Sequence, residues 1–228
     1  MSKKSKLVSL RGIVEDSNII EQFEKLQVNL SLSSVDKKAQ VIQVTSSLQD
    51  EGKTTIAVNL ANSYAMKGSS VLVIDLDIRR PKIHRNFNQV NDNGIVDYAA
   101  GTVEKEHLIK KTTYGIDVIN TGKKSPYPVK ILESALIKDL IEDMRAKYDY
   151  IILDSPPVSP VIDPIIISKL TDAVVFVVQA NRTKKSDIKE SIKQLENAKA
   201  NIAGIVLTNV KAKYSKYSYK YKYEENGN

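Results

Sequence analysis

Short runs of apolar residues alternate with amphipathic segments along this chain. The apolar runs predict strands near residues 40–46, 70–76, 115–120, 149–154, 173–179 and 203–208. Apolar residues spaced by three or four positions predict helices near 17–32, 54–67, 81–87, 104–110, 129–147, 162–170 and 185–199. Continuous apolar strands separated by helices are typical of parallel sheets that are covered on both faces. We therefore predict an α/β fold with a doubly wound, mostly parallel sheet and helices on both faces.

The two ends of the chain differ in composition from the segment between them. Residues 1–16 read as a polar, basic arm, and Ser17 is the expected N-cap of the first helix. Residues 17–210 hold all the predicted strands and helices, and a chain of 228 residues fits one such domain. Residues 211–228 contain tyrosine, lysine and serine but no leucine, isoleucine or valine. An edge strand and a base-stacking segment are alternatives, but this composition favours a flexible tail.

A loop joins the strand near 40–46 to the helix near 54–67, and it ends in Gly52, Lys53 and Thr54. This order of elements is the context of a P-loop, in which backbone N–H groups and the helix N-terminus hold phosphate oxygens. Lys53 would reach the β- and γ-phosphates of ATP, and the Thr54 hydroxyl would bind Mg²⁺. The sheet is therefore expected to be of the P-loop NTPase type. A plain strand-to-helix turn is the alternative, because Ser47 replaces the first glycine of the motif. The residues expected around the nucleotide are Ser47, Gln49, Asp50, Glu51, Gly52, Lys53, Thr54 and Thr55.

Two further predicted strands end in acidic residues. Asp75 and Asp77 lie at the end of the strand near 70–76, and Asp154 lies at the end of the strand near 149–154. Because the carboxyl ends of parallel strands meet at one sheet edge, these carboxylates are expected beside the P-loop. There they would hold Mg²⁺ and its water molecules and take a proton from an acceptor hydroxyl. Capping of the following helices is the alternative role for each acid. The predicted metal-site residues are Thr54, Asp75, Asp77 and Asp154.

Composition excludes several kinds of site. The chain has no cysteine, so neither a disulfide framework nor a thiolate metal site is possible, and a reducing cytoplasm fits this absence. No apolar run approaches the roughly 18 residues that span a bilayer, so we expect any membrane association to use surface charge or a partner. The net charge of +7 includes a basic segment at each end of the chain. Without a recognised nucleic-acid module, this charge does not predict nucleic-acid binding.

Together these motifs resemble those of the bacterial tyrosine kinases, or BY-kinases. The loop from Ser47 to Thr55, the acidic segments 74–81 and 151–157 and a C-terminal tyrosine cluster occur in the order of that family. The resemblance covers essentially the whole chain and is to the short Gram-positive type of capsule and exopolysaccharide synthesis. It implies a protein-tyrosine kinase that uses ATP and Mg²⁺ and phosphorylates its own C-terminal cluster. The implied phosphoacceptors are Tyr214, Tyr217, Tyr219, Tyr221 and Tyr223.

The resemblance also implies roles for residues and a set of partners. Lys53 would stabilise the transferring phosphate, and Arg79 would lie near the developing negative charge. Asn209 is a candidate for the adenine pocket. The implied partners are a transmembrane activator that recruits the kinase to the inner face of the membrane, protein substrates that carry tyrosine, and other copies of the chain in a ring. The implied catalytic residues are Lys53, Asp75, Asp77, Arg79 and Asp154.

Some positions depart from the pattern of the family. Asp50 stands where glycine is frequent, which would weaken ATP binding, although aspartate tolerates left-handed backbone. Leu48 stands where positioning ATPases of the same fold carry an extra lysine, so a kinase is favoured over a positioning ATPase. The arginines that support the ring are replaced by Glu24 and Gln27, and an acid is replaced by Lys130. These changes suggest either a swapped ion pair between subunits or independent drift with loss of the ring. A weakly catalytic regulatory subunit is a further alternative.

Overall fold

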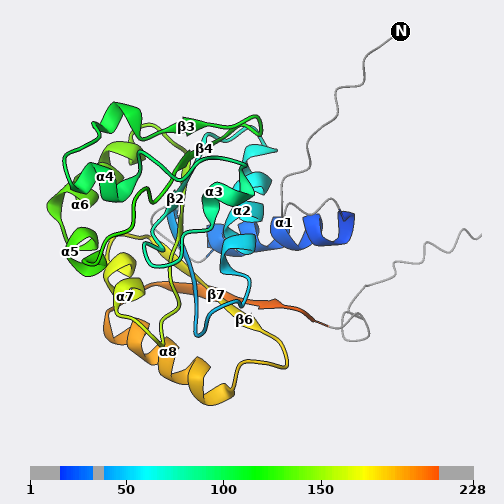
Figure 1. Cartoon of the computed structure of the whole chain (residues 1–228). Helices are drawn as coiled ribbons and strands as arrows, with labels where there is room; N and C mark the ends of the chain where they lie inside the picture. The colour runs from blue at the N-terminus through cyan, green and yellow to red at the C-terminus, as the bar shows by residue number, and fades with distance from the viewer. Residues whose placement is uncertain (1–15, 33–38, 211–228) are drawn as a thin grey trace, which may run out of the picture.

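The computed structural model describes residues 16–32 and 39–210, and these residues form one sheet with helices on both faces (Figure 1). Its seven strands lie in the order β3-β4-β2-β5-β1-β6-β7, and all pairs are parallel except β3 with β4. The predicted fold class is confirmed. The predicted basic arm and tyrosine tail lie outside the described residues. The strands are β1 Val41–Ser46, β2 Val71–Asp75, β3 Lys110–Lys111, β4 Ile116–Ile119, β5 Tyr150–Asp154, β6 Ala173–Gln179 and β7 Ile202–Thr208.

The helices agree with the sequence pattern in most places. The first helix begins at Ser17, and the Asp16 carbonyl accepts a hydrogen bond from the Ile20 N–H, so the expectation that Ser17 is the N-cap was wrong by one residue. Within the described residues, no helix is long and apolar enough to cross a membrane. The helices are α1 Ser17–Leu32, α2 Lys53–Ala65, α3 Ile83–Asn86, α4 Ile95–Ala99, α5 Pro128–Leu132, α6 Ala135–Arg145, α7 Asp163–Ser168 and α8 Lys185–Asn197.

Three helix predictions need correction. Residues 104–110 form only a 3-10 turn, η1 Lys105–His107, because the chain then enters β3 and pairs antiparallel with β4. The helix predicted over 129–147 is two helices, since Ser134 has extended backbone between α5 and α6. Helix α4 was not predicted. It follows Gly94, where a Cβ atom would lie only 2.3 Å from the carbonyl oxygen of Asn120, so this tight approach to β4 requires glycine.

Alternate residues of the central strands fill two different cores. On β2, Val71 and Val73 pack with α1 and α2, whereas Leu72 and Ile74 pack on the opposite face with α6. A smaller cluster lies between β6 and α8. The central strands are buried on both faces. Polar side chains of these strands therefore become accessible mainly at the strand ends.

Helix α1 is attached to α2 through a buried glutamine. The Nε2 of Gln27 donates to the Ser63 hydroxyl at 2.8 Å, and its Oε1 accepts a hydrogen bond from the Lys67 ammonium at 2.6 Å. The side chain of Gln27 therefore makes its hydrogen bonds within the chain. Glu24 and Lys130 are both exposed, so the hypothesis of a swapped pair between subunits stays a prediction for these two residues.

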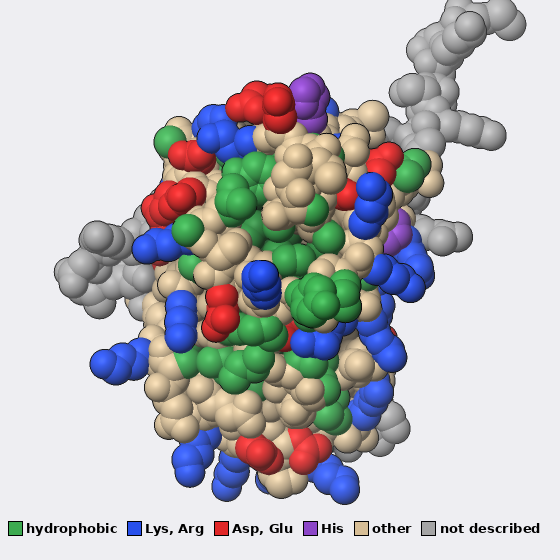
Figure 2. Space-filling model, turned by 60° about the vertical axis from the view of Figure 1, so that its left-hand side comes forward, with side chains coloured by type: hydrophobic (Ala, Val, Ile, Leu, Met, Phe, Trp, Pro, Cys, Tyr) green, Lys and Arg blue, Asp and Glu red, His purple; other side chains and the backbone are tan. Residues whose placement is uncertain are grey.

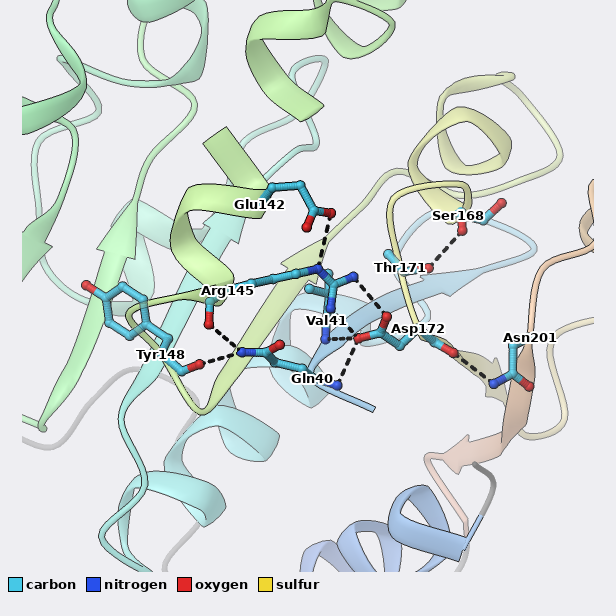
Figure 3. A network of polar contacts seen from close by, with 9 residues as sticks. All are labelled: Gln40, Val41, Glu142, Arg145, Tyr148, Ser168, Thr171, Asp172 and Asn201. Carbon is cyan, nitrogen blue, oxygen red and sulfur yellow. Dashed lines mark hydrogen bonds and ion pairs between the residues drawn. The ribbon is translucent and has the colours of Figure 1, made fainter. Parts of the chain in front are cut away.

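A polar network closes the amino-terminal edge of the sheet (Figure 3). The Asp172 carboxylate accepts hydrogen bonds from the backbone N–H groups of Gln40 and Val41 at 2.9 and 2.7 Å. It also accepts hydrogen bonds from both terminal nitrogens of Arg145 at 2.7 and 2.8 Å. The Gln40 side chain donates to the backbone carbonyls of Arg145 and Tyr148. The network thus joins the start of β1 to the end of α6, at the edge away from the P-loop.

Asp172→Asn should lower the free energy of unfolding by about 2 kcal/mol, because a half-buried charged acceptor of several hydrogen bonds is lost. Burial acts to raise the pKa of Asp172, but Arg145 and the backbone donors lower it on balance. The contribution should therefore be complete above the unfolded pKa of about 3.9 and disappear as the pH falls through the lower folded pKa. Urea denaturation at several pH values measures this, with exposed Asp139→Asn as the control. Equal stability of the two variants at neutral pH would contradict it.

Candidate active site

The predicted phosphate and acid motifs meet at the carboxyl-terminal edge of the sheet. The P-loop follows β1, while Asp75 ends β2 and Asp154 ends β5. These three strands are neighbours in the order β2-β5-β1, and Asp75 is paired with Asp154 in the parallel register. The expectation that three separate segments share one edge is therefore confirmed, and it places the site where α/β sheets bind their ligands.

The P-loop has the backbone shape that phosphate binding requires. Asp50 and Gly52 have φ angles of 59° and 98°, so both lie in the left-handed region, and Asp50 keeps the shape that glycine would allow. Helix α2 begins at Lys53, and the N–H of Ile56 donates to the Gly52 carbonyl at 2.9 Å. Lys53 is buried at the base of the loop. Burial lowers the pKa of the Lys53 ammonium, and the charges of Asp154 and Asp77 act against this shift.

Thr54 and Asp154 are in direct contact. The Thr54 hydroxyl donates to Oδ2 of Asp154 at 2.7 Å, while the buried Oδ1 has no hydrogen-bond partner among the described residues. Burial, opposed by Thr54 and Lys53, raises the pKa of Asp154 to about 7. The hydroxyl and the spare carboxylate oxygen are donors of the kind that Mg²⁺ prefers. In the described part of the chain no three acidic or histidine side chains form a metal cluster, so an ion here would also need phosphate oxygens and water.

Asp75 has the capping role that the sequence left as an alternative. Its fully buried carboxylate accepts hydrogen bonds from the backbone N–H groups of Asp77, Lys82 and Ile83 at 3.1, 3.0 and 3.0 Å. Burial, followed by the charge of Asp154, raises the pKa of Asp75. These bonds fix the turn that carries Asp77 and start α3. The direct metal role of Asp75 stays a prediction.

Asp77 is more accessible and remains the candidate base. Its Oδ1 accepts a hydrogen bond from the Arg80 backbone N–H at 2.9 Å. Burial raises the pKa of Asp77, and the Arg80 N–H, Lys53 and Lys82 oppose that shift. A carboxylate held beside the P-loop lysine is placed to accept a proton from a hydroxyl that attacks a phosphate.

A cavity of about 420 Å³ lies in front of the P-loop. The motif residues of the P-loop line one wall of the cavity, as the sequence predicts. The other wall is lined by Lys82, Arg85 and Asn86, from α3 and the residue before it, and the sequence motifs did not predict these three residues. The Lys82 ammonium donates to the Asp50 carboxylate at 2.8 Å across the mouth of this cavity. The cations follow Pro81 in a segment with no motif, so only the fold brings them to the phosphates. The residues that line the cavity are Asp50, Gly52, Lys53, Thr54, Thr55, Lys82, Arg85 and Asn86.

Several residues that are predicted to surround the nucleotide make contacts that support the loop. Glu51 is buried, and its carboxylate accepts hydrogen bonds from the Leu48 N–H at 2.6 Å and from the Thr183 hydroxyl. It therefore holds the loop from behind and does not line the phosphate cavity. Ser47 is also buried, and the side chain of Gln49 accepts a hydrogen bond from Arg80 at 2.7 Å.

Asn209 and the tail relate to the site differently. Asn209 directly follows β7, whose last residue Thr208 donates its hydroxyl to the Glu51 carbonyl at 2.8 Å. The residue is thus one position from a direct P-loop contact, and its adenine role stays a prediction. The five predicted phosphoacceptor tyrosines lie outside the described residues.

Arg79, which is predicted to lie near the transferring phosphate, is paired with a buried acid. Its Nε and Nη2 donate to the two oxygens of Asp163 at 2.8 and 3.1 Å. Asp163 is fully buried at the start of α7, and it raises the pKa of Arg79. Arg79 does not line the phosphate cavity. Its side chain is directed to the start of α7.

Known proteins resemble this chain in sequence and in fold. A family model described as an AAA domain matches residues 39–207. The chain is 31% identical over 201 residues to tyrosine-protein kinase YwqD of Bacillus subtilis (strain 168), which covers 87% of this chain and 85% of that protein. It is 34% identical over 199 residues to tyrosine-protein kinase CpsD of Streptococcus pneumoniae serotype 4 (strain ATCC BAA-334 / TIGR4), with 86% and 87% covered. The chain belongs to the bacterial tyrosine-protein kinase family.

A solved structure supports the same relationship for this bacterial tyrosine kinase. The kinase domain of Escherichia coli tyrosine kinase ETK has a TM-score of 0.79 and 28% sequence identity, covering 82% of this chain and 74% of that chain. The family and the enzyme class expected from the motifs are thereby confirmed, and a P-loop kinase fold implies that the enzyme uses a nucleotide. The roles of individual residues stay predictions that rest on the geometry above.

Proposed function

We propose that this kinase transfers the γ-phosphate of ATP to tyrosines of its own C-terminal cluster, with Mg²⁺ as cofactor. The observation that carries the proposal is the Thr54–Asp154 contact of 2.7 Å, at which the charges of the buried Lys53 and of the candidate base Asp77 both act on Asp154. This arrangement has a phosphate cation, a metal-compatible hydroxyl and a carboxylate base at one sheet edge. These are the components that phosphoryl transfer to a hydroxyl requires.

In the proposed reaction the phenol oxygen of the acceptor attacks the γ-phosphorus, and the bond from that phosphorus to the β–γ bridging oxygen breaks. Asp77 accepts the phenol proton, which is useful because free tyrosine has a pKa of about 10. Lys53 stabilises the charge on the transferring group. Bound Mg²⁺ would neutralise phosphate charge, with Thr54 and Asp154 holding it directly or through water.

The proposed setting of this reaction follows the family resemblance. The kinase would act at the inner face of the membrane with a transmembrane activator, associate with other copies of itself and control exopolysaccharide or capsule synthesis through protein substrates. Exposed Glu24 and Lys130 are compatible with contacts to another subunit, whereas buried Gln27 serves the chain itself. ADP and phosphotyrosine would be the products.

The test is incubation with ATP, Mg²⁺ and a peptide from the cytoplasmic tail of a candidate activator, followed by mass spectrometry of the C-terminal peptide. We expect phosphate on Tyr214, Tyr217, Tyr219, Tyr221 or Tyr223. The matched control replaces these five tyrosines by Phe, which should remove the signal and leave nucleotide binding unchanged. Free phosphate without phosphotyrosine would indicate a positioning ATPase instead. Neither product would indicate a regulatory subunit with weak chemistry.

A further inference from the structure

A second cavity, of about 500 Å³, has Arg79 in its wall, two residues after Asp77. It lies on the face of the molecule that carries α5 and α7, where hydrophobic side chains gather among a few charged ones (Figure 2). Its most exposed aromatic side chain is Tyr127, which is 68% exposed and stands between two prolines. The residues that line it are Arg79, Pro126, Tyr127, Pro128, Val129, Lys130 and Glu133.

The cavity has one fixed polar group in its wall. Arg79 is held by the fully buried Asp163 through Nε and Nη2, so the guanidinium is locked in direction and Nη1 is left to donate to another acceptor. The charges around the cavity balance, because Arg79 is paired with Asp163 and the rim carries both Lys130 and Glu133. A neutral aromatic group with peptide carbonyls suits this lining better than a phosphate does.

The position of Asp77 relates the two cavities. Asp77 lies two residues before Arg79, which lines the second cavity, and five residues before Lys82, which lines the phosphate cavity. The short segment that carries the candidate base therefore contributes one residue to the wall of each cavity, although Asp77 itself lines neither. An acceptor hydroxyl has to reach this carboxylate from the side that the nucleotide does not fill.

We infer that the second cavity is the docking site of the acceptor peptide, with a tyrosine-bearing segment packed against Tyr127 and held by Arg79. This inference rests on the proposed kinase function and adds a binding site to it. Tyr127 and the adjacent prolines supply a rigid apolar wall for an aromatic ring, and Nη1 of Arg79 supplies a donor for a main-chain carbonyl. Asp163 is then a positioning residue, because it acts through Arg79.

The experiment compares Tyr127→Ala and Tyr127→Phe with the parent, using a synthetic peptide with the sequence of residues 211–225 as acceptor. Since Tyr127 is exposed, neither change should disturb folding. Tyr127→Ala should lower kcat/KM for the peptide about tenfold, as loss of an aromatic anchor does, and Phe should restore it. The KM for ATP and the peptide-independent hydrolysis of ATP should stay within about twofold. Met66→Ala, an exposed apolar residue just after α2, is the control and should change nothing.

Other outcomes would overturn the inference. An equal loss of peptide phosphorylation and ATP hydrolysis would place Tyr127 in the chemistry of the nucleotide site. A loss accompanied by a smaller oligomer in light scattering would make the cavity a subunit interface, and an unchanged kcat/KM would remove the docking site. If the parent phosphorylates no tyrosine, the proposed function fails by itself. Fluorescence anisotropy of the labelled peptide then still decides the cavity, because Tyr127→Ala should weaken binding and Met66→Ala should not.

Discussion

Lys53→Met is expected to abolish measurable phosphotyrosine formation while the protein stays folded. The Lys53 ammonium is buried at the first residue of α2, where burial lowers its pKa and the charges of Asp154 and Asp77 act against that shift. Its removal takes from the phosphate cavity the cation that we propose to stabilise the transferring group. Loss of one group that stabilises the transition state costs about 100- to 1,000-fold in kcat.

The measurement is incorporation of phosphate from radiolabelled ATP, together with circular dichroism to show that the fold is intact. Lys147→Met is the matched control, because this lysine is exposed just before β5, at the amino-terminal edge of the sheet away from the P-loop. The control should keep the parent activity. Full activity in a folded Lys53→Met protein would exclude the P-loop assignment.

Asp77→Asn should retain ATP binding and lose about 100-fold or more of kcat. The substitution keeps the size of the side chain and its acceptor oxygen for the Arg80 N–H, but it removes the carboxylate that takes the phenol proton. Because burial raises the pKa of Asp77, activity of the parent should fall as the pH drops through that raised value, since a base must be unprotonated. The variant should lack this part of the pH profile.

Steady-state kinetics over a pH series and a nucleotide-binding titration separate the possible roles of Asp77. Asp139→Asn, an exposed acid on α6, is the control for a lost surface charge. A large loss of nucleotide affinity with unchanged turnover would show that Asp77 binds the nucleotide and does not act as a base. An unchanged pH profile in Asp77→Asn would assign the proton transfer to another group.

The parts of the fold that were predictable depend on local pattern. Strands β1, β2, β5 and β6 are buried on both faces, so each appears as a mainly apolar run, interrupted in β1 by the buried Gln43 and Thr45, with its acid or loop at the correct end. The parallel topology then brings the ends together without further information. Helix α4 and strand β3 were missed because each is short and is fixed by tertiary contacts with β4, at Gly94 and through strand pairing.

The parts of the site that were not predictable depend on partners distant in sequence. Arg79 reads as a charge-stabilising arginine from its motif, but Asp163, 84 residues later, holds its guanidinium. Glu51 reads as part of the nucleotide loop, whereas contacts from Thr183 make it a support. Lys82 has no motif at all and reaches the phosphate cavity only because Asp75 fixes the turn before α3.

The contact between Gln27, Ser63 and Lys67 has a consequence for engineering subunit contacts in this kinase. An arginine at position 24 would replace an exposed acid, and it would need no space inside the protein. An arginine at position 27 would enter a buried site beside the Lys67 ammonium. It would replace the Gln27 amide oxygen, which accepts a hydrogen bond from Lys67, by a second positive charge. The two arginine positions of the relatives are therefore not equivalent here: the first is open to exchange, and the second requires a compensating change on α2 or the residues just after it.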